Sequence, residues 1–233
     1  MTNSAVHLAY SRAHRAFKVL VCLAGLAFSL FVSSALADES KAPLIVAFGD
    51  SLTAGYGLEP GAAFPNQLEA ALQSRGFSGA KVHNAGVSGD TSSGGRSRLS
   101  WNLSALGRTP DLLILELGAN DALRGLPPER TKSNLVAILE ELERRGIPVL
   151  LTGMMAPPNL GDEYGAEFNG IYPALAAQYR VPLYPFFLDG VAADPALNQD
   201  DGMHPTREGV AIIVEKILPD VLAALDAAAP ALQ

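Results

Sequence analysis

The chain of 233 residues is 48% hydrophobic and 18% charged, which is the composition of a globular protein and excludes a disordered one. It carries 17 basic and 24 acidic residues, a net charge of −7, so it lacks the basic balance of a nucleic-acid-binding protein. Its one cysteine, Cys22, excludes an intrachain disulfide and any zinc site built on two cysteines. The sequence also lacks the Walker A and HExxH motifs, and we expect no cofactor, no metal and no nucleic-acid partner.

The first 37 residues have the three parts of a secretory signal peptide. Three basic residues precede an apolar run over residues 19–32, and small residues stand at positions −3 and −1 for cleavage after Ala37. An uncleaved membrane anchor is the alternative, but the run is shorter than the ~20 residues that a spanning helix needs. We therefore predict export to the periplasm or beyond, no stable membrane anchor after cleavage, and a mature chain of residues 38–233.

Strand and helix patterns alternate about five times along the mature chain, with no linker or repeat between them. In chain order we expect a strand at 43–48, a helix at 63–75, a strand at 81–84, a helix at 93–106, a strand at 111–117, a helix at 128–145, a strand at 148–152, a helix at 162–179, a strand or extended segment at 181–187 and a helix at 206–225. Pro173 and Pro219 predict bends in the last two helices. The alternation predicts one α/β domain, a three-layer α/β/α sandwich on a five-stranded parallel sheet.

Polar, glycine-rich turns follow the first three predicted strands, at residues 49–52, 84–91 and 118–121. A fourth such turn, at 200–205, precedes the last helix. In sheets of this kind ligands bind beyond the carboxyl ends of the strands, so the four turns predict where the functional site lies.

One histidine stands in a position suited to activating a nucleophile. His7 and His14 lie in the predicted signal peptide, and His83 lies in the middle of a predicted strand. His204 lies in the fourth turn, three residues after Asp201. From that spacing a carboxylate can reach ring nitrogen Nδ1 and leave Nε2 to accept a proton.

The first three turns offer a nucleophile and hydrogen-bond donors. Ser51 lies between the first strand and a helix, where its N–H would point toward the site, although it could be only a helix N-cap. Gly89 offers a backbone N–H with no side chain in the way, and Asn120 offers a side-chain amide. Either could instead be a turn residue, but donors of this kind are what a developing oxyanion requires.

The segments GDSLTAGYG, NAGVSGDTS, LELGANDALRG, VPLYPFF and QDDGMHP resemble the SGNH/GDSL hydrolase superfamily, and most closely its bacterial thioesterase I/arylesterase/lysophospholipase group. The resemblance covers essentially the whole mature chain and implies the SGNH hydrolase fold, which is flavodoxin-like. It implies that Ser51 is the nucleophile, His204 the general base and Asp201 the third member of the triad. It also implies an oxyanion hole made by the Ser51 N–H, the Gly89 N–H and the Asn120 amide.

The resemblance further implies an exported serine esterase for carboxylic esters and thioesters, namely aryl esters, short or medium acyl esters, acyl-CoA and lysophospholipids. The group places a mobile substrate-gating segment at 122–128, so Ala122 and Leu123 are expected to contact substrate. Met155 and Pro157 are expected to do the same, although an Arg-Leu-Pro stretch often stands there in thioesterase I members. The alternatives are a carbohydrate acetylesterase of the same superfamily and a non-catalytic lipid- or glycan-binding protein. We expect a monomer whose partner is a small-molecule ester or lipid.

Four further residues are expected to have no part in chemistry. Asp50 is predicted to fix the turn before Ser51, and Asp121 to cap a helix or brace a loop. Asp200 is predicted to be solvated, and Trp101 to pack against the domain.

Overall fold

A computed structural model describes residues 42–228 of the chain. Its sheet has five parallel strands in the order β2-β1-β3-β4-β5, namely β1 (Leu44–Gly49), β2 (Lys81–Gly86), β3 (Leu112–Leu115), β4 (Val149–Thr152) and β5 (Leu183–Tyr184). This is the flavodoxin-like order, and the predicted α/β sandwich is confirmed. The predicted signal peptide, residues 1–37, lies outside the described residues and stays a prediction.

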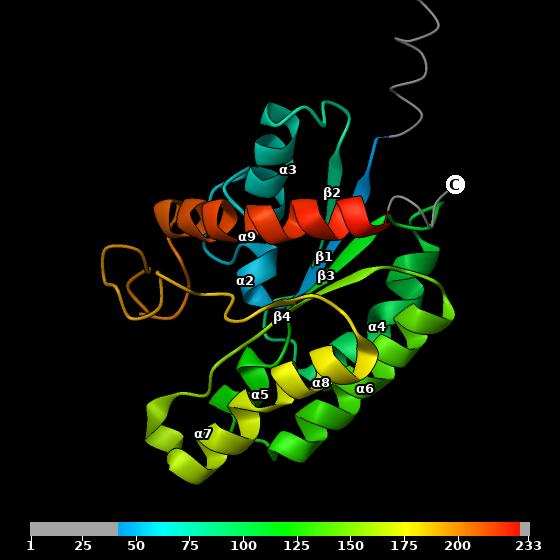
Figure 1. The fold of residues 1–233 in the computed structure, drawn as a ribbon. Helices are drawn as coiled ribbons and strands as arrows, with labels where there is room; N and C mark the ends of the chain where they lie inside the picture. Colours follow the sequence, from blue (N-terminus) through cyan, green and yellow to red (C-terminus); the bar gives the residue numbers. More distant parts are fainter. Residues whose placement is uncertain (1–41, 229–233) are drawn as a thin grey trace, which may run out of the picture. The chain divides into compact units, whose positions relative to one another are not determined.

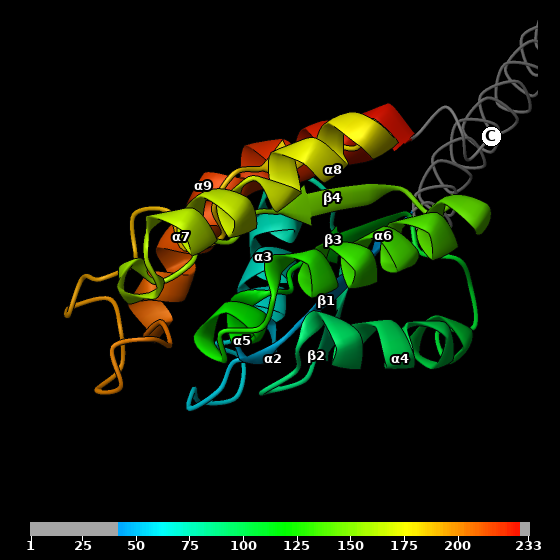
Figure 2. The same cartoon turned by 90° about the horizontal axis from the view of Figure 1, so that it is seen from below.

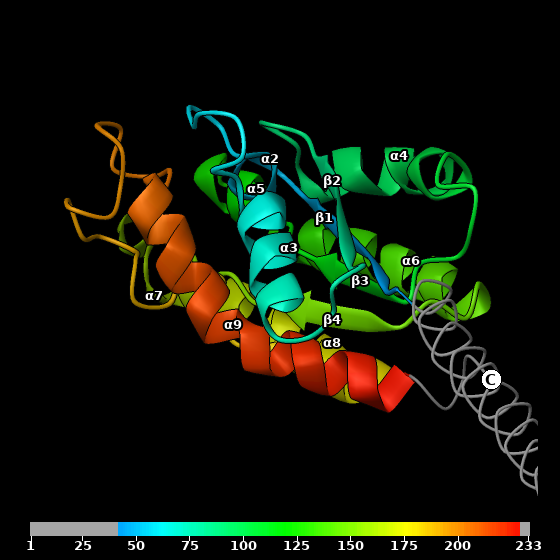
Figure 3. The ribbon, with the colours of Figure 1, turned by 90° about the horizontal axis from the view of Figure 1, so that it is seen from above.

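Helices cover both faces of the sheet (Figure 1). Helices α3 (Phe64–Ser74) and α9 (Arg207–Ala228) pack together on one face, and α4 (Ser92–Ser104), α6 (Pro128–Arg144) and α8 (Ile171–Tyr179) pack on the other. Figure 3 looks onto the face that α3 and α9 cover, with the strands behind α3 and with α8 behind α9. This division follows from right-handed crossovers, which place the helices on opposite faces once the strand order reverses at β1.

The core forms where the two helical layers meet the central strands. Strands β1 and β3 have fully buried interiors, as expected of parallel strands that are covered on both faces. Helix α6 buries Leu135, Ile138, Leu139 and Leu142, the spacing that predicted it. Burying each such side chain contributes about 1.5–3 kcal/mol to stability.

Two short helices and a long loop lie at the carboxyl ends of the strands, where the sequence analysis places the polar turns. Helix α2 (Ser51–Ala54) follows β1, and α5 (Ala119–Leu123) follows β3. Figure 2 shows both at the same end of the sheet as the segment between β5 and α9, drawn in orange. The predicted convergence of the polar turns on this edge is therefore confirmed.

Two expectations were wrong. The segment 162–179 is not one bent helix but two, α7 (Asp162–Asn169) and α8, which meet at Gly170. Pro173 lies in the first turn of α8, where its missing N–H is not needed. Trp101 does not pack against the domain but is 73% exposed, because it lies opposite the buried face of α4.

Within residues 42–228 no helix is both long enough and apolar enough to cross a membrane. A short 3-10 helix, η1 (Pro158–Leu160), completes the regular structure between β4 and α7.

Candidate active site

Three side chains form a continuous hydrogen-bonded chain at the carboxyl edge of the sheet. Ser51 is the first residue of α2, and its Oγ lies 2.9 Å from Nε2 of His204. The other ring nitrogen, Nδ1, lies 2.6 Å from Oδ2 of Asp201. A hydroxyl, an imidazole and a carboxylate in this order are what activates a serine for attack on a carbonyl.

The loop that carries Asp201 and His204 is held by its own hydrogen bonds. Oδ1 of Asp201 accepts from the backbone N–H of Met203 at 2.9 Å and of His204 at 3.0 Å. Gln199 N–H donates to the His204 carbonyl at 2.7 Å, and Gln199 Nε2 reaches across to the Tyr56 carbonyl at 2.8 Å. These hydrogen bonds therefore hold the loop, and with it the His204 ring, in position before any substrate binds.

The electrostatics of this loop keep Asp201 charged. The N–H of His204, its ring and the N–H of Met203 all donate to this carboxylate and lower its pKa from 3.8 to about 2. Asp201 is therefore an anion at any pH at which a serine hydrolase works. A fixed negative charge at Nδ1 favours the tautomer that leaves Nε2 facing Ser51 as an acceptor.

The turn after β2 presents a backbone N–H. Asp90 N–H donates to the Val87 carbonyl at 3.1 Å, and Gly89 has a φ of +83°, in the left-handed region that glycine adopts without strain. Arg124 donates to the Gly89 carbonyl at 2.8 Å. Among the described residues neither the Gly89 N–H nor the Ser51 N–H has an acceptor, so both are open to a ligand.

The side-chain amide of Asn120 is oriented by Asp50. Asn120 Nδ2 donates to Asp50 Oδ2 at 2.9 Å, so the nitrogen end of the amide faces Asp50 and one N–H remains for a ligand. The other oxygen of Asp50 accepts from Leu52 N–H at 2.9 Å and caps α2. The prediction that Asp50 fixes this turn is confirmed.

A second carboxyl group lies directly behind Asp50. Glu116 is fully enclosed, and its Oε2 accepts from the Thr53 hydroxyl at 2.8 Å and from the Asp50 N–H at 3.2 Å. Burial raises the pKa of Asp50 to about 6 and raises that of Glu116 well above its usual value, to which the Asp50 charge adds.

Asp121 braces the segments next to the site through hydrogen bonds, as predicted. It accepts from the N–H of Ser92 at 2.7 Å, from the Ser92 hydroxyl at 2.5 Å and from the Thr131 hydroxyl at 3.1 Å. It thereby joins the start of α4 to α6, beside the turn that carries Asn120.

Ser51 and His204 line a cleft of about 610 Å³. Among the described residues its lining also includes Gly89, Asn120 and apolar residues of the segments 52–56, 119–123, 154–158 and 186–193, and no Asp, Glu, Lys or Arg. Carbon therefore forms most of the surface that a ligand would contact, and such a surface suits an alkyl or aryl group.

Three of the four residues expected to contact substrate line this cleft. Leu123, Met155 and Pro157 do so, and Leu123 and Met155 are 53% and 52% exposed. Ala122 is fully buried and does not line the cleft. It follows Asp121 in α5, on the side of the helix that packs into the core.

The sequence analysis missed two residues of the site. The Tyr56 ring lies 4.6 Å from the His204 ring and lines the cleft, and nothing in its sequence context marks it. Glu116 had a signal, because it is the one charged residue inside the apolar run that forms β3 and its continuation. Among residues 42–228 no group of three His, Cys, Asp or Glu side chains could hold a metal ion.

The chain matches the model of the GDSL-like lipase/acylhydrolase family over residues 47–212. The arylesterase of Vibrio mimicus is 38% identical over 197 residues, which cover 84% of this chain and 96% of the arylesterase. The thioesterase 1/protease 1/lysophospholipase L1 of Escherichia coli is 39% identical over 176 residues, which cover 76% of this chain and 82% of that protein. The crystal structure of AlinE4, an SGNH-hydrolase family esterase, has a TM-score of 0.67 at 52% identity and covers 79% of this chain and 97% of its own.

The sheet order and these relatives define the class as an ester hydrolase with the SGNH fold. The chain belongs to the GDSL-like lipase/acylhydrolase family and is a serine ester hydrolase.

Proposed function

We propose that Ser51, His204 and Asp201 are the catalytic triad of this hydrolase. The observation that carries the proposal is the unbroken chain of contacts, 2.9 Å and 2.6 Å long, at the wall of the apolar cleft. Ser51 Oγ attacks the acyl carbonyl while His204 Nε2 takes the hydroxyl proton. Asp201 holds the ring in the required tautomer and stabilises the imidazolium that forms.

The N–H groups of Ser51 and Gly89 and the Asn120 amide stabilise the negative oxygen of the tetrahedral intermediate. Each residue lines the cleft, and each has an N–H for which the described part of the chain supplies no acceptor. A donor of this kind contributes about 2.7–4 kcal/mol in the transition state.

The intermediate then collapses and His204 returns its proton to the departing alcohol or thiol. The acyl group remains as an ester on Ser51. A water molecule, deprotonated by His204, attacks that ester. The second intermediate collapses, the bond from the acyl carbon to Ser51 Oγ breaks, His204 returns the proton to Oγ, and the carboxylic acid leaves.

The cleft favours short to medium acyl or aryl groups over sugars. Its lining is mostly carbon and carries no charged side chain that could bind a phosphate. Aryl esters and lipid-derived acyl esters therefore fit it better than acetylated polysaccharide does. Acyl-CoA, which is a thioester, and lysophospholipids are included as proposed substrates because the Escherichia coli relative is named a thioesterase and a lysophospholipase. In both, the acyl chain is the part that we propose to occupy the apolar cleft.

We also propose that residues 1–37 direct export and are removed. The charged start, the apolar run and the small residues before position 38 support this, and the cleavage product can be identified by N-terminal sequencing.

The central experiment is hydrolysis of p-nitrophenyl esters from acetate to palmitate. We expect an optimum between butyrate and decanoate, loss of nearly all turnover in Ser51→Ala and His204→Ala, and full activity in the matched control Ser93→Ala, which changes an exposed serine. Activity on acetate alone would favour the acetylesterase alternative. An active Ser51→Ala protein would contradict the assignment of the nucleophile.

A further inference from the structure

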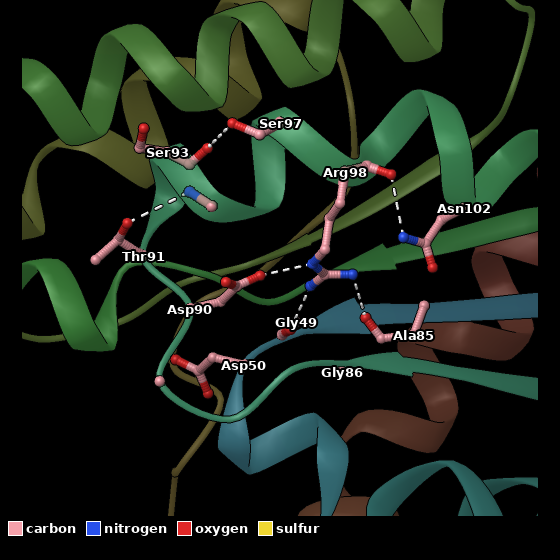
Figure 4. Close-up of polar contacts among 12 residues, drawn as sticks. Gly49, Asp50, Ala85, Gly86, Asp90, Thr91, Ser93, Ser97, Arg98 and Asn102 are labelled. Atoms are coloured by element: carbon pink, nitrogen blue, oxygen red, sulfur yellow. Dashed lines mark hydrogen bonds and ion pairs between the residues drawn. The ribbon is translucent and has the colours of Figure 1, made fainter.

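An arginine on α4 connects the segments that carry two of the proposed oxyanion donors (Figure 4). Arg98 Nε donates to Asp90 Oδ2 at 2.6 Å, Nη1 to the Ala85 carbonyl at 2.7 Å and Nη2 to the Gly49 carbonyl at 2.7 Å. The guanidinium also lies 4.1 Å from the centre of the Phe48 ring. One side chain thus holds the end of β1, the end of β2 and the turn that follows β2.

These contacts are shielded from water. The Arg98 and Asp90 side chains are 16% and 18% exposed. Charged hydrogen bonds in such surroundings are shorter and stronger than exposed ones, and the rigid guanidinium fork fixes the directions of its acceptors. An arginine paired only at the surface would not have this effect.

Helix α4 lies close enough to the strands for Arg98 to reach these acceptors because residue 95 is a glycine. It is one helical turn before Arg98 on the buried face of α4, and a Cβ at this position would overlap a Leu117 methyl. Without a side chain there, α4 approaches the strands closely, so the guanidinium arrives at their carboxyl ends.

The hydrogen bonds of Arg98 hold both ends of the Gly89 turn, residues 87–90. Asp90 follows Gly89 directly, and the Gly49 carbonyl, which Arg98 binds, also accepts from Val87 N–H at 3.0 Å. Val87 and Asp90 are the first and last residues of the turn, and both are tied to the same arginine. The peptide between Ser88 and Gly89, which carries the Gly89 N–H, lies between them and forms no hydrogen bond with any residue of 42–228.

We propose that Arg98 is a positioning residue of the hydrolase, which aims the Gly89 N–H at the oxyanion through Asp90 and Gly49. The inference rests on the proposed role of Gly89 in the oxyanion hole. Arg98 does not line the cleft, so it acts on the turn and not on the substrate. It holds the donor in place before the negative charge develops, which is the condition for effective stabilisation.

The test compares Arg98→Lys with Arg96→Lys. A lysine keeps the charge beside Asp90, but its three N–H donors share one nitrogen, which cannot occupy the positions of Nε, Nη1 and Nη2 at once. Removal of a whole donor lowers kcat by about 10²–10³, so a displaced donor is expected to lower it by about ten- to a hundredfold. Arg96 is exposed on the same helix, and its lysine variant is expected to retain wild-type kcat.

The readout separates positioning from general damage. In Arg98→Lys we expect KM to stay within about twofold, and kcat to fall by the same factor for acetate, butyrate and octanoate esters, because every ester develops the same oxyanion. Inactivation by a neutral p-nitrophenyl alkylphosphonate, whose oxygen enters the same hole, should slow by a similar factor. A kcat within twofold of wild type, or a changed chain-length profile, would overturn the proposal.

If the lysine variant does not fold, Asp90→Asn decides, because it weakens the same link from the other side. Its kcat should fall with an unchanged KM, and a wild-type kcat would overturn the proposal. Ser51→Ala is measured alongside. If that protein is active, the proposed triad has failed. If it is inactive while Arg98→Lys and Asp90→Asn are normal, only the positioning role has failed.

Discussion

The substitution Asp201→Asn tests the catalytic chain through a change of a single atom. In the native loop Oδ1 of Asp201 accepts two backbone N–H groups, and Oδ2 binds Nδ1 of His204. An asparagine must keep its oxygen at the Oδ1 position to satisfy those donors, so its NH₂ group faces Nδ1. The ring then carries its proton on Nε2 and cannot accept one from Ser51.

The structure sets the size of the effect. To restore the active tautomer the amide would have to turn over, which breaks two N–H···O bonds and places NH₂ against two N–H groups. The Asp201 side chain is 33% exposed, so each lost bond costs about 1–2 kcal/mol. A total of about 2–4 kcal/mol corresponds to a loss of about 30- to 1,000-fold in kcat.

The assay is steady-state hydrolysis of p-nitrophenyl butyrate, with the melting temperature as the check on folding. Asp200→Asn is the matched control, because this exposed neighbour makes no contact with the ring, and it should retain wild-type kcat. If Asp201→Asn keeps kcat within about fivefold of wild type, the carboxylate does not set the tautomer and the reasoning is wrong.

Three further predictions concern stability and specificity. The pKa of Asp50 is raised from 3.8 to about 6, so burial of its charge lowers stability by up to about 3 kcal/mol as the pH rises through that window. The Asp50→Asn protein lacks this pH-dependent loss. Its free energy of unfolding in urea, relative to that of wild type, should therefore rise by up to that amount between pH 4 and 7. If the two proteins show parallel curves of stability against pH, the raised pKa of Asp50 is contradicted. Gly118→Ala should lower the free energy of unfolding by about 3 kcal/mol in the same assay, because φ is +120° and the new Cβ would overlap the Tyr172 hydroxyl. In the control Gly125→Ala the new Cβ has no neighbouring atom, so the loss should be only about 1 kcal/mol. Equal losses in the two variants would show that the overlap at residue 118 is relieved. Met155→Trp, which adds bulk to an exposed lining residue, should move the p-nitrophenyl ester optimum to shorter chains, and an unchanged profile would remove Met155 from the acyl site.

The place of the site could be predicted because parallel strands end at a common edge. Once strands are predicted at 43–48, 81–84 and 111–117 in a parallel sheet, the turns that follow them have to meet there. The contact between Ser51 and His204 spans 153 residues of sequence and was expected from this topology together with the family resemblance. Local spacing alone accounts for the contact of His204 with Asp201.

The remaining features depend on tertiary packing, which a sequence pattern does not encode. The sequence analysis predicts that Trp101 packs against the domain, but α4 turns Gly95 and Leu99 toward the sheet and leaves Trp101 exposed. It also predicts one helix over 162–179 with a bend at Pro173, whereas the segment forms two helices that meet at Gly170. Both errors concern which side or end of a helix a residue occupies, and that is decided by neighbours distant in sequence.

The two parts of the site differ in their surroundings, because one lines the open cleft and the other is buried behind it. Ser51 and His204, the proposed nucleophile and base, line the cleft, where such groups must meet substrate and water. Behind the proposed oxyanion donors, buried polar groups hold the turns, with Asp50 on the Asn120 amide and Asp121 on the start of α4.

Apolar packing could fill that space at lower cost, because burying a carboxyl lowers stability, as the raised pKa of Asp50 shows. Apolar contacts, however, do not fix the direction in which an N–H points, whereas hydrogen bonds do. If the proposed oxyanion donors are correct, a network of carboxyls and one arginine behind the turns exchanges part of the folding stability for donors whose direction is fixed before the charge develops.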